Sequence, residues 1–194
     1  MNNNFHGLRH QSRRVSSRFT QSGYSIFDLI VTSAVAGVLS LGAVGMTGLV
    51  QDTRMTATVN LLMGDLSLAR SEAIKRGSRV AICRSNDGIS CSGSSWNEGW
   101  IVFSDANENY KLDDGENLVR VQQGMQENMS LRYGGEIMSY ARMAYYPEGY
   151  ARPNATFTFC DSRGSAKAKA VIINMVGRPY SSTKSWENKP LECS

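Results

Sequence analysis

Histidine is almost missing from this 194-residue chain, and the two that occur, His6 and His10, both lie within the first 23 residues. If that segment is removed, the mature protein has no histidine. This excludes a Ser-His-Asp or Cys-His nucleophile, a His-containing zinc site and the usual general base near pH 7. Carboxylates or lysines would be the remaining catalytic groups. The sequence therefore predicts a protein that is not an enzyme.

No C-x-x-C pair occurs among the four cysteines, which argues against zinc or thioredoxin-like chemistry. In an exported domain an even cysteine count indicates disulfides, and four cysteines allow three pairings. We favour Cys83 with Cys91, which closes a short Asn/Gly/Ser loop, and Cys160 with Cys193, which ties down a polar C-terminal tail. Each disulfide would contribute roughly 2–4 kcal/mol. Free buried thiols are the alternative.

Acidic residues are missing from the first 23 residues, which hold four arginines. The chain has a formal net charge of +4, so removing this segment leaves 4 − 4 = 0. The overall basicity is therefore mostly a targeting signal. A nucleic-acid interaction would need a local basic patch instead.

Charge is also missing from residues 29–50, a run of 22 residues rich in Val, Leu, Ala and Gly. As a helix this run covers about 33 Å, enough for a bilayer core. The preceding basic segment orients the N-terminus toward the cytoplasm. A secretory signal usually has an apolar region of about 7–15 residues that ends at a small-residue cleavage site. Because this run is longer and no such site follows, we expect the helix to remain on the mature protein.

The residues that follow predict an amphipathic continuation of the same helix. One apolar stripe recurs at alternating steps of four and three residues, which favours packing against a sheet. Gly77 after Lys75 and Arg76 is a plausible helix end. The expected helix covers residues 26–76. The stripe is Met55, Val59, Leu62, Leu66, Ala69 and Ala73, with Arg54, Asn60, Asp65, Arg70 and Lys75 expected elsewhere on the surface.

After Gly77 the pattern changes to short β-type runs separated by turn residues. Such short runs with tight connections favour antiparallel pairing. One long helix followed by strands predicts an α+β fold with one globular domain. The expected strands cover residues 79–84, 100–104, 118–122, 130–133, 144–146, 156–160 and 168–174.

The segment at the start of the apolar helix, residues 23–31, reads GYSIFDLIV. It resembles the signature of type IV pilins and type II secretion pseudopilins. In that family a prepilin peptidase cuts after the Gly and methylates the new N-terminal aromatic residue, here Tyr24 after Gly23. The resemblance implies a leader over residues 1–23, a transmembrane and filament-core helix over 24–50, and a soluble periplasmic or surface domain over 51–194. The family usually has Phe and Glu where this chain has Tyr24 and Asp28.

Asp28 lies inside the apolar helix, at the fifth position of the expected mature chain. A carboxylate at the centre of a bilayer costs about 2.5–3.5 kcal/mol and less near the interface, so a partner is expected. The resemblance implies that this partner is the N-terminal ammonium of a neighbouring pilin, met as the helix leaves the inner membrane for the filament. The alternative is an interfacial carboxylate among lipid headgroups.

Further segments resemble the GspH/FimT branch of minor pilins and pseudopilins. This resemblance implies a minor type IV pilin that starts or caps a pilus. The alternative is a GspH-type pseudopilin of type II secretion. The segments are residues 69–74, Cys83 and Cys91, and residues 96–105, 159–164 and 177–178.

Some members of this branch bind DNA during natural transformation through a C-terminal Gly-Arg-x-Arg motif. Gly177 and Arg178 match its first half, but Tyr180 replaces the second Arg. A stretch without acids nevertheless surrounds this motif and could hold phosphates, with Tyr180 and Trp186 stacking on bases. The alternative is a solvated basic edge strand. The cations of the stretch are Arg163, Lys167, Lys169, Arg178 and Lys184.

Oxygen-bearing side chains between residues 105 and 116 have the spacing of an EF-hand-like loop. Such ligands suit calcium. Tyr110, however, occupies the position where the sharp turn requires Gly. The alternative is a polar hairpin that uses Asp and Asn for its turn, and no other cofactor is expected. The candidate ligands are Asp105, Asn107, Asn109, Asp113 and Glu116.

Overall fold

The computed structural model describes residues 23–125, 128–134, 140–154 and 156–193, except for the side chains of residues 38–46. The chain forms two compact units, Met1–Met46 and Thr47–Ser194. The predicted leader, residues 1–23, lies outside the described residues except for Gly23.

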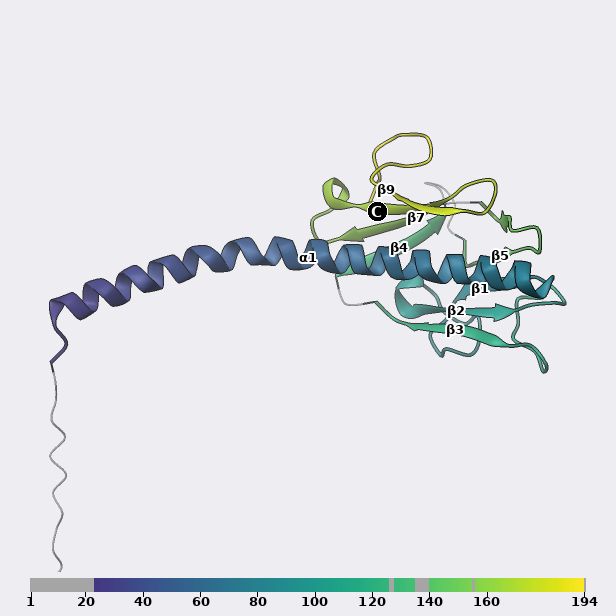
Figure 1. Cartoon of the computed structure of the whole chain (residues 1–194), viewed down its shortest axis with the longest axis horizontal. Helices are drawn as coiled ribbons and strands as arrows, with labels where there is room; N and C mark the ends of the chain where they lie inside the picture. The colour runs from purple at the N-terminus through teal and green to yellow at the C-terminus, as the bar shows by residue number, and fades with distance from the viewer. Residues whose placement is uncertain (1–22, 126–127, 135–139, 155, 194) are drawn as a thin grey trace, which may run out of the picture. The chain divides into compact units, whose positions relative to one another are not determined.

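One long helix, α1 (Ile26–Arg76), covers the predicted range (Figure 1). It ends with Lys75 and Arg76 in its last turn, followed by Gly77 in the left-handed conformation at φ 61°. Cations near the negative end of the helix dipole and a left-handed glycine after it are typical of a helix C-terminus. Within the described part of the chain, no helix is long and apolar enough to cross a membrane. The predicted span includes residues 38–46, whose side chains lie outside the description.

Two antiparallel sheets form the rest of the Thr47–Ser194 unit, which confirms the predicted α+β class. The first has the strand order β3-β2-β1-β5-β6 and the second the order β4-β7-β8-β9. In Figure 1, β2 and β3 lie on one side of α1 and β4, β7 and β9 on the other. The strands are β1 (Val80–Arg84), β2 (Gly99–Ser104), β3 (Leu118–Gln123), β4 (Met129–Gly134), β5 (Arg142–Tyr145), β6 (Ala151–Arg152), β7 (Thr156–Asp161), β8 (Lys169–Ile173) and β9 (Pro179–Ser182), with short 3-10 helices η1 (Trp96–Glu98) and η2 (Ser165–Lys167).

The predicted stripe of α1 is buried in one core with the inner faces of both sheets. All six of its side chains, from Met55 to Ala73, are at most 2% exposed. Their partners include Val80 and Ile82 from the first sheet and Phe157 from the second. Alternation along each strand selects these partners, because successive side chains point to opposite faces of a sheet.

The outer face of each sheet has its own cover, fastened by a disulfide. Cys83 faces outward from β1 and pairs with Cys91, with a Cα–Cα distance of 5.5 Å. Cys160 faces outward from β7 and pairs with Cys193 across 33 residues. Both are the pairings that we favoured from the sequence. The loops on the first sheet and the C-terminal tail on the second are therefore covalently attached to the faces that they cover.

The seven predicted strands occur, with ends shifted by one or two residues. Two strands were missed. β6 is only two residues long, too short for an alternation pattern, and β9 is four residues long and begins with Pro179, a residue uncommon in strand interiors. Because β9 is an edge strand of its sheet, a proline at its first position is tolerated.

Asp65 corrects one expectation about the helix surface. Its side chain is buried in the structure rather than exposed. It accepts a hydrogen bond from Nε1 of buried Trp100 at 2.9 Å and another from Nε of Arg120 at 3.0 Å. Burial raises the pKa of Asp65, although Trp100 and Arg120 both favour the charged form. Asp65 therefore satisfies the indole N–H in the core.

Replacing Asp65 tests this contact. Asp65→Ala leaves Nε1 of Trp100 without an acceptor, so we expect the free energy of unfolding of the Thr47–Ser194 unit to fall by about 1–3 kcal/mol. Asp65→Asn keeps an acceptor oxygen and should lose less. Urea unfolding at neutral pH measures both changes.

The pH dependence of the same variants has a defined sign. A carboxyl group whose pKa is higher in the folded than in the unfolded protein binds its proton more tightly in the folded state. Its contribution to the stability of the fold therefore decreases as pH rises from the unfolded-state pKa, about 3.9, through the folded-state pKa. The stability of the native protein relative to Asp65→Asn should therefore decrease with pH across that window. A relative stability that increases with pH would contradict the assignment.

Candidate assembly helix and C-terminal surface

The N-terminus of α1 is a capped helix start at the predicted processing site. Ser25 precedes the first helical residue, and its Oγ accepts a hydrogen bond from the backbone N–H of Phe27 at 3.4 Å. Oδ2 of Asp28 accepts one from the backbone N–H of Ser25 at 3.2 Å. Together these bonds cap the helix start, and the negative charge lies at the positive end of the helix dipole. Asp28 therefore stabilises the first turn of its own helix.

Apolar side chains surround this carboxylate and have no cover among the described residues of the unit Met1–Met46. More than half of the surface of each of five of them is exposed. Such a continuous apolar surface is typical of a contact with lipid or with other proteins. The five are Ile26, Phe27, Leu29, Ile30 and Val31.

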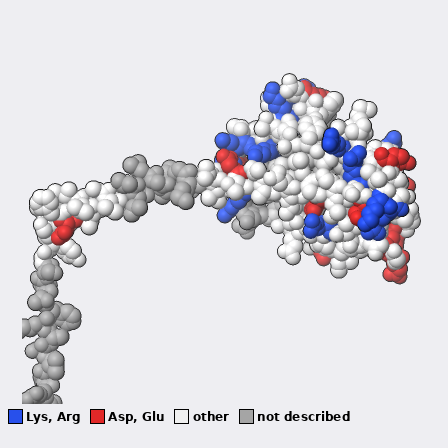
Figure 2. Space-filling model, viewed as in Figure 1, with Lys and Arg blue, Asp and Glu red and all other residues white. Residues whose placement is uncertain are grey.

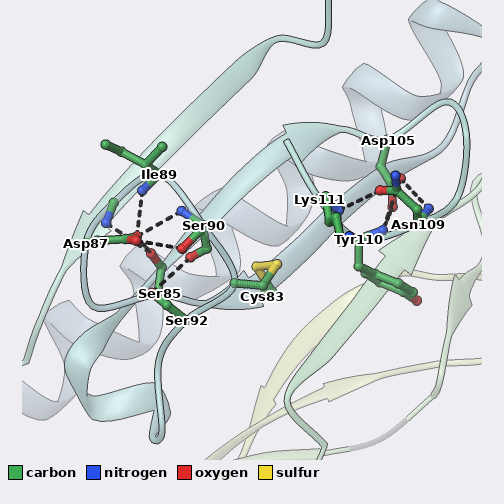
Figure 3. Close-up of a disulfide and its surroundings, with 12 residues drawn as sticks. Cys83, Ser85, Asp87, Ile89, Ser90, Ser92, Asp105, Asn109, Tyr110 and Lys111 are labelled. Atoms are coloured by element: carbon green, nitrogen blue, oxygen red, sulfur yellow. Dashed lines mark hydrogen bonds between the residues drawn. A yellow bond between two sulfur atoms is a disulfide. The ribbon is translucent and has the colours of Figure 1, made fainter. Parts of the chain in front are cut away.

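The predicted calcium ligands lie in one loop between β2 and β3, where they act as acceptors for the loop itself. Asp105 is fully buried and accepts hydrogen bonds from the backbone N–H groups of Asn109 and Tyr110 (Figure 3). Oδ2 of Asp113 accepts from the side-chain amides of Asn107 and Asn109. Oε1 of Glu116 accepts from the backbone N–H of Ala106 at 2.9 Å.

A protein cation already lies against this loop. The guanidinium of Arg79 is 2.8 Å from Oδ2 of Asp105 and 4.0 Å from the centroid of the Tyr110 ring. It also donates to the backbone oxygen of Glu108 at 3.2 Å. Burial raises the pKa of Asp105, while Arg79 favours its charged form. Arg79, 26 residues upstream of Asp105, was not part of the sequence-based site. It supplies positive charge where the calcium hypothesis requires a metal ion.

Within the described residues, no group of three or more His, Cys, Asp or Glu side chains could hold a metal ion. We expect equal melting temperatures of the Thr47–Ser194 unit in calcium and in chelator, because Arg79 neutralises Asp105. Differential scanning calorimetry measures this. A rise of several degrees in calcium that Asp113→Asn abolishes would instead establish the calcium site.

Three of the five predicted DNA-contacting cations are divided between the two ends of one hairpin. Lys169 begins β8 and Lys184 follows Ser182, which pairs with Ala170, so these two lie at the same end of the β8-β9 hairpin. Arg178 lies at the opposite end, in the turn between the two strands. The five-residue length of β8 separates the ends by about 13 Å. On the face in Figure 2, Lys and Arg side chains are interspersed with Asp and Glu.

Arg163 and Lys169 have partners within the protein. Arg163 forms two ion pairs of 2.6 Å, one with Asp161 at the end of β7 and one with Asp52 of α1. These hydrogen bonds hold the pKa values of both carboxyl groups below their usual range. Nζ of Lys169 donates to Oγ1 of Thr56 at 2.8 Å. Both cations therefore hold the β7-β8 connection against the helix.

The backbone conformation and the close packing at position 177 require glycine. Its φ is 78°, and a Cβ at this position would lie 2.0 Å from the backbone oxygen of Gly149. Arg70 of α1 donates to the oxygens of Gly149 and Val176 at 2.8 and 3.2 Å. The Gly-Arg pair thus forms a tight turn fixed to α1, and the side chain of Arg178 is exposed.

Comparison with known structures agrees with this architecture. The crystal structure of the type IV minor pilin FimU of Pseudomonas aeruginosa is similar at a TM-score of 0.54 and 18% identity, over 74% of this chain and 98% of that one. A second crystal form of the same pilin gives 0.52 at 18% identity, over 72% and 99%. The minor pseudopilin EpsH of the Vibrio cholerae type 2 secretion system gives 0.47 at 13% identity, over 66% and 96%. No curated protein matches the chain.

A long helix packed on antiparallel sheets is the architecture of a pilin-like subunit. The family model described as type II transport protein GspH matches residues 58–177, more than half of the chain. The protein belongs to this family. Its members are structural pilin and pseudopilin subunits rather than enzymes. The match confirms the family that we assigned from the sequence.

Proposed function

We propose that this protein is a minor type IV pilin that helps to start or cap a pilus. A prepilin peptidase cuts after Gly23 and methylates Tyr24. The helix over residues 24–50 anchors the subunit in the inner membrane, with the domain over residues 51–194 in the periplasm, until the subunit enters the filament. The observation that carries this proposal is the capped start of α1, a single carboxylate within an exposed apolar surface.

The geometry around Asp28 suits a contact between subunits. Cleavage after Gly23 creates an ammonium on Tyr24, next to the Ser25 N–H that Asp28 already binds at 3.2 Å. A carboxylate has about four lone-pair sites, so Asp28 can cap its own helix and still accept from the ammonium of a neighbouring subunit. This pairing neutralises both charges as apolar helices pack together.

A GspH-type pseudopilin of type II secretion is the alternative within the same class. FimU, which has a similar fold, is a type IV minor pilin, whereas the matching family model is described as a type II transport protein, so an experiment has to separate the two. A deletion strain separates the two, because loss of surface pili supports the pilin and loss of secreted proteins supports the pseudopilin.

Asp28 variants test the proposed assembly contact. In the deletion strain, Asp28→Asn should be processed but should restore pili at least about tenfold less well than the native gene, because the ammonium has no anionic partner. Asp28→Glu keeps the charge and should restore them. Immunoblots of sheared pili give the amounts, and mass spectrometry of the mature protein should find a methylated Tyr24 as its first residue.

A mature protein that begins downstream of residue 50 would refute the proposal. Full assembly by Asp28→Asn would show that the carboxylate has no role in it. Thr32→Val is the matched control, since its Oγ1 donates only to backbone oxygens of its own helix.

DNA binding at the pilus tip during natural transformation is the second candidate function. The observation that favours it is that Lys167, Arg178 and Lys184 are exposed, as are the rings of Tyr180 and Trp186. Exposed cations can bind phosphates, and exposed aromatic rings can stack on bases, without all of them forming one patch. We leave Arg163 out of this surface because two carboxylates already neutralise it.

Gel shifts with the Thr47–Ser194 unit and single-stranded DNA test this function. If Arg178 contacts a phosphate, Arg178→Ala should weaken binding severalfold and reduce the slope of log affinity against log salt by about 0.7. Lys111→Ala, in the loop between β2 and β3, is the control and should change neither value. Binding that is absent, or equal in Arg178→Ala, would end the hypothesis.

A further inference from the structure

A groove of about 810 Å³ lies on the outer face of the β4-β7-β8-β9 sheet. One row of cross-strand neighbours contributes to its floor. Gly134 pairs with Thr156, Thr156 with Ile172, and Ile172 with Tyr180. The side chains of this row point away from the core, because those of the next residues, Phe157 and Val171, are in it. Pilus assembly through α1 makes no use of this row, and the DNA-binding candidate uses only Tyr180 among its four residues.

The C-terminal loop forms one wall of the groove and is held at its base. Lys184 and Pro190 form an isolated β-bridge, and backbone N–H groups of Lys189 and Asn188 interact with Ser185 within the loop. Leu191 is buried on the sheet, and Cys193 is fixed to Cys160. Figure 1 shows this loop projecting from the sheet, in yellow. The loop is therefore ordered before any ligand arrives, which lowers the entropic cost of binding.

Two exposed aromatic rings and buried hydroxyl groups are part of the lining of the groove. Trp186 of the loop is 72% exposed and Tyr180 of β9 is 43% exposed. Thr156 is only 6% exposed, and its Oγ1 has no hydrogen-bond partner among the described residues. Thr158 in the neighbouring row is also buried. A buried hydroxyl without a partner is destabilising, so the floor of the groove favours a ligand that supplies polar groups.

The charges of the lining cancel. Arg132 and Lys189 carry two positive charges, and Glu187 and Glu192 carry two negative charges. A phosphate chain would gain little from this balance, since its binding depends on neutralisation by cations. An extended peptide is also disfavoured, because β7 and β8 are paired on both sides and offer no free backbone groups for strand addition.

We propose that this groove binds an uncharged oligosaccharide. The apolar C–H face of a pyranose ring can stack on Trp186 and on Tyr180, and its hydroxyl groups can pair with Thr156, Thr158 and the amide of Asn154. The volume lies within the range of about 300–1,000 Å³ for small-ligand sites, which suits a short chain of sugar rings. The groove gives the subunit a carbohydrate-recognition site on its globular domain.

Tryptophan fluorescence of the full chain in a detergent without sugar headgroups tests this site. The probes are maltotriose, cellotriose and triacetylchitotriose. Trp96 and Trp100 are buried, so a signal from Trp186 stands out. We expect at least one trisaccharide to change the emission saturably at millimolar or lower concentration. Isothermal titration calorimetry then gives affinities for the variants, which should fall at least tenfold in Trp186→Ala.

Thr156→Val separates binding from folding. It removes an unpartnered hydroxyl at nearly constant volume, so the melting temperature should stay the same or rise while sugar affinity falls severalfold. Ile89→Ala, at an exposed apolar residue outside the groove, should bind like the native chain. Absence of binding by all three sugars, or equal binding by Trp186→Ala, would overturn the proposal. Salt-sensitive, Trp186-dependent binding of single-stranded DNA without sugar binding would replace it with a nucleic-acid site.

Discussion

Both sheets of the globular unit bury their inner faces against the same stripe of α1. Each sheet alone would leave one apolar face in water, and neither face could be covered by the short loops between strands. The six stripe residues, from Met55 to Ala73, join two separate sheets into one core. Because the helix covers both inner faces, a movement of the helix away from the sheets would expose the apolar side chains of this shared core to water. Polar side chains of α1 also contact the sheets and the turns between their strands, which fixes the same arrangement.

Those polar contacts involve the segments that resemble the GspH/FimT branch. Arg70 binds the turns at Gly149 and Val176, and Trp100 donates to Asp65. Asp161 holds Arg163, which reaches Asp52 on the helix. Much of the motif therefore encodes how the helix is attached to the sheets. Similarity in these segments is evidence for the fold and says less about ligands.

Periodicity was enough to predict the helix and the stripe, because both depend on residues near each other in the sequence. Alternation likewise located the longer strands. A short loop and a polar C-terminal tail were enough to favour the two disulfide pairings. Contacts over long separations were not predictable. Arg163 meets Asp52 across 111 residues, and the calcium-like spacing gave no sign that Arg79 would reach Asp105. Asp65 was misplaced because its neighbour Leu66 belongs to the stripe, and a polar residue beside a stripe is normally solvated.

The disulfide between Cys160 and Cys193 gives the C-terminal loop a dependence on compartment. Thiols stay reduced in the cytosol and become oxidised after export. Under the proposed export, the wall that carries Trp186 becomes covalently anchored only once the domain has left the cytoplasm. A freshly made chain would carry its sheet and helix core but a loosely held tail, so its outer surface would mature later than its interior. That surface would therefore bind a ligand only after the disulfide has formed outside the cytoplasm, and not during synthesis.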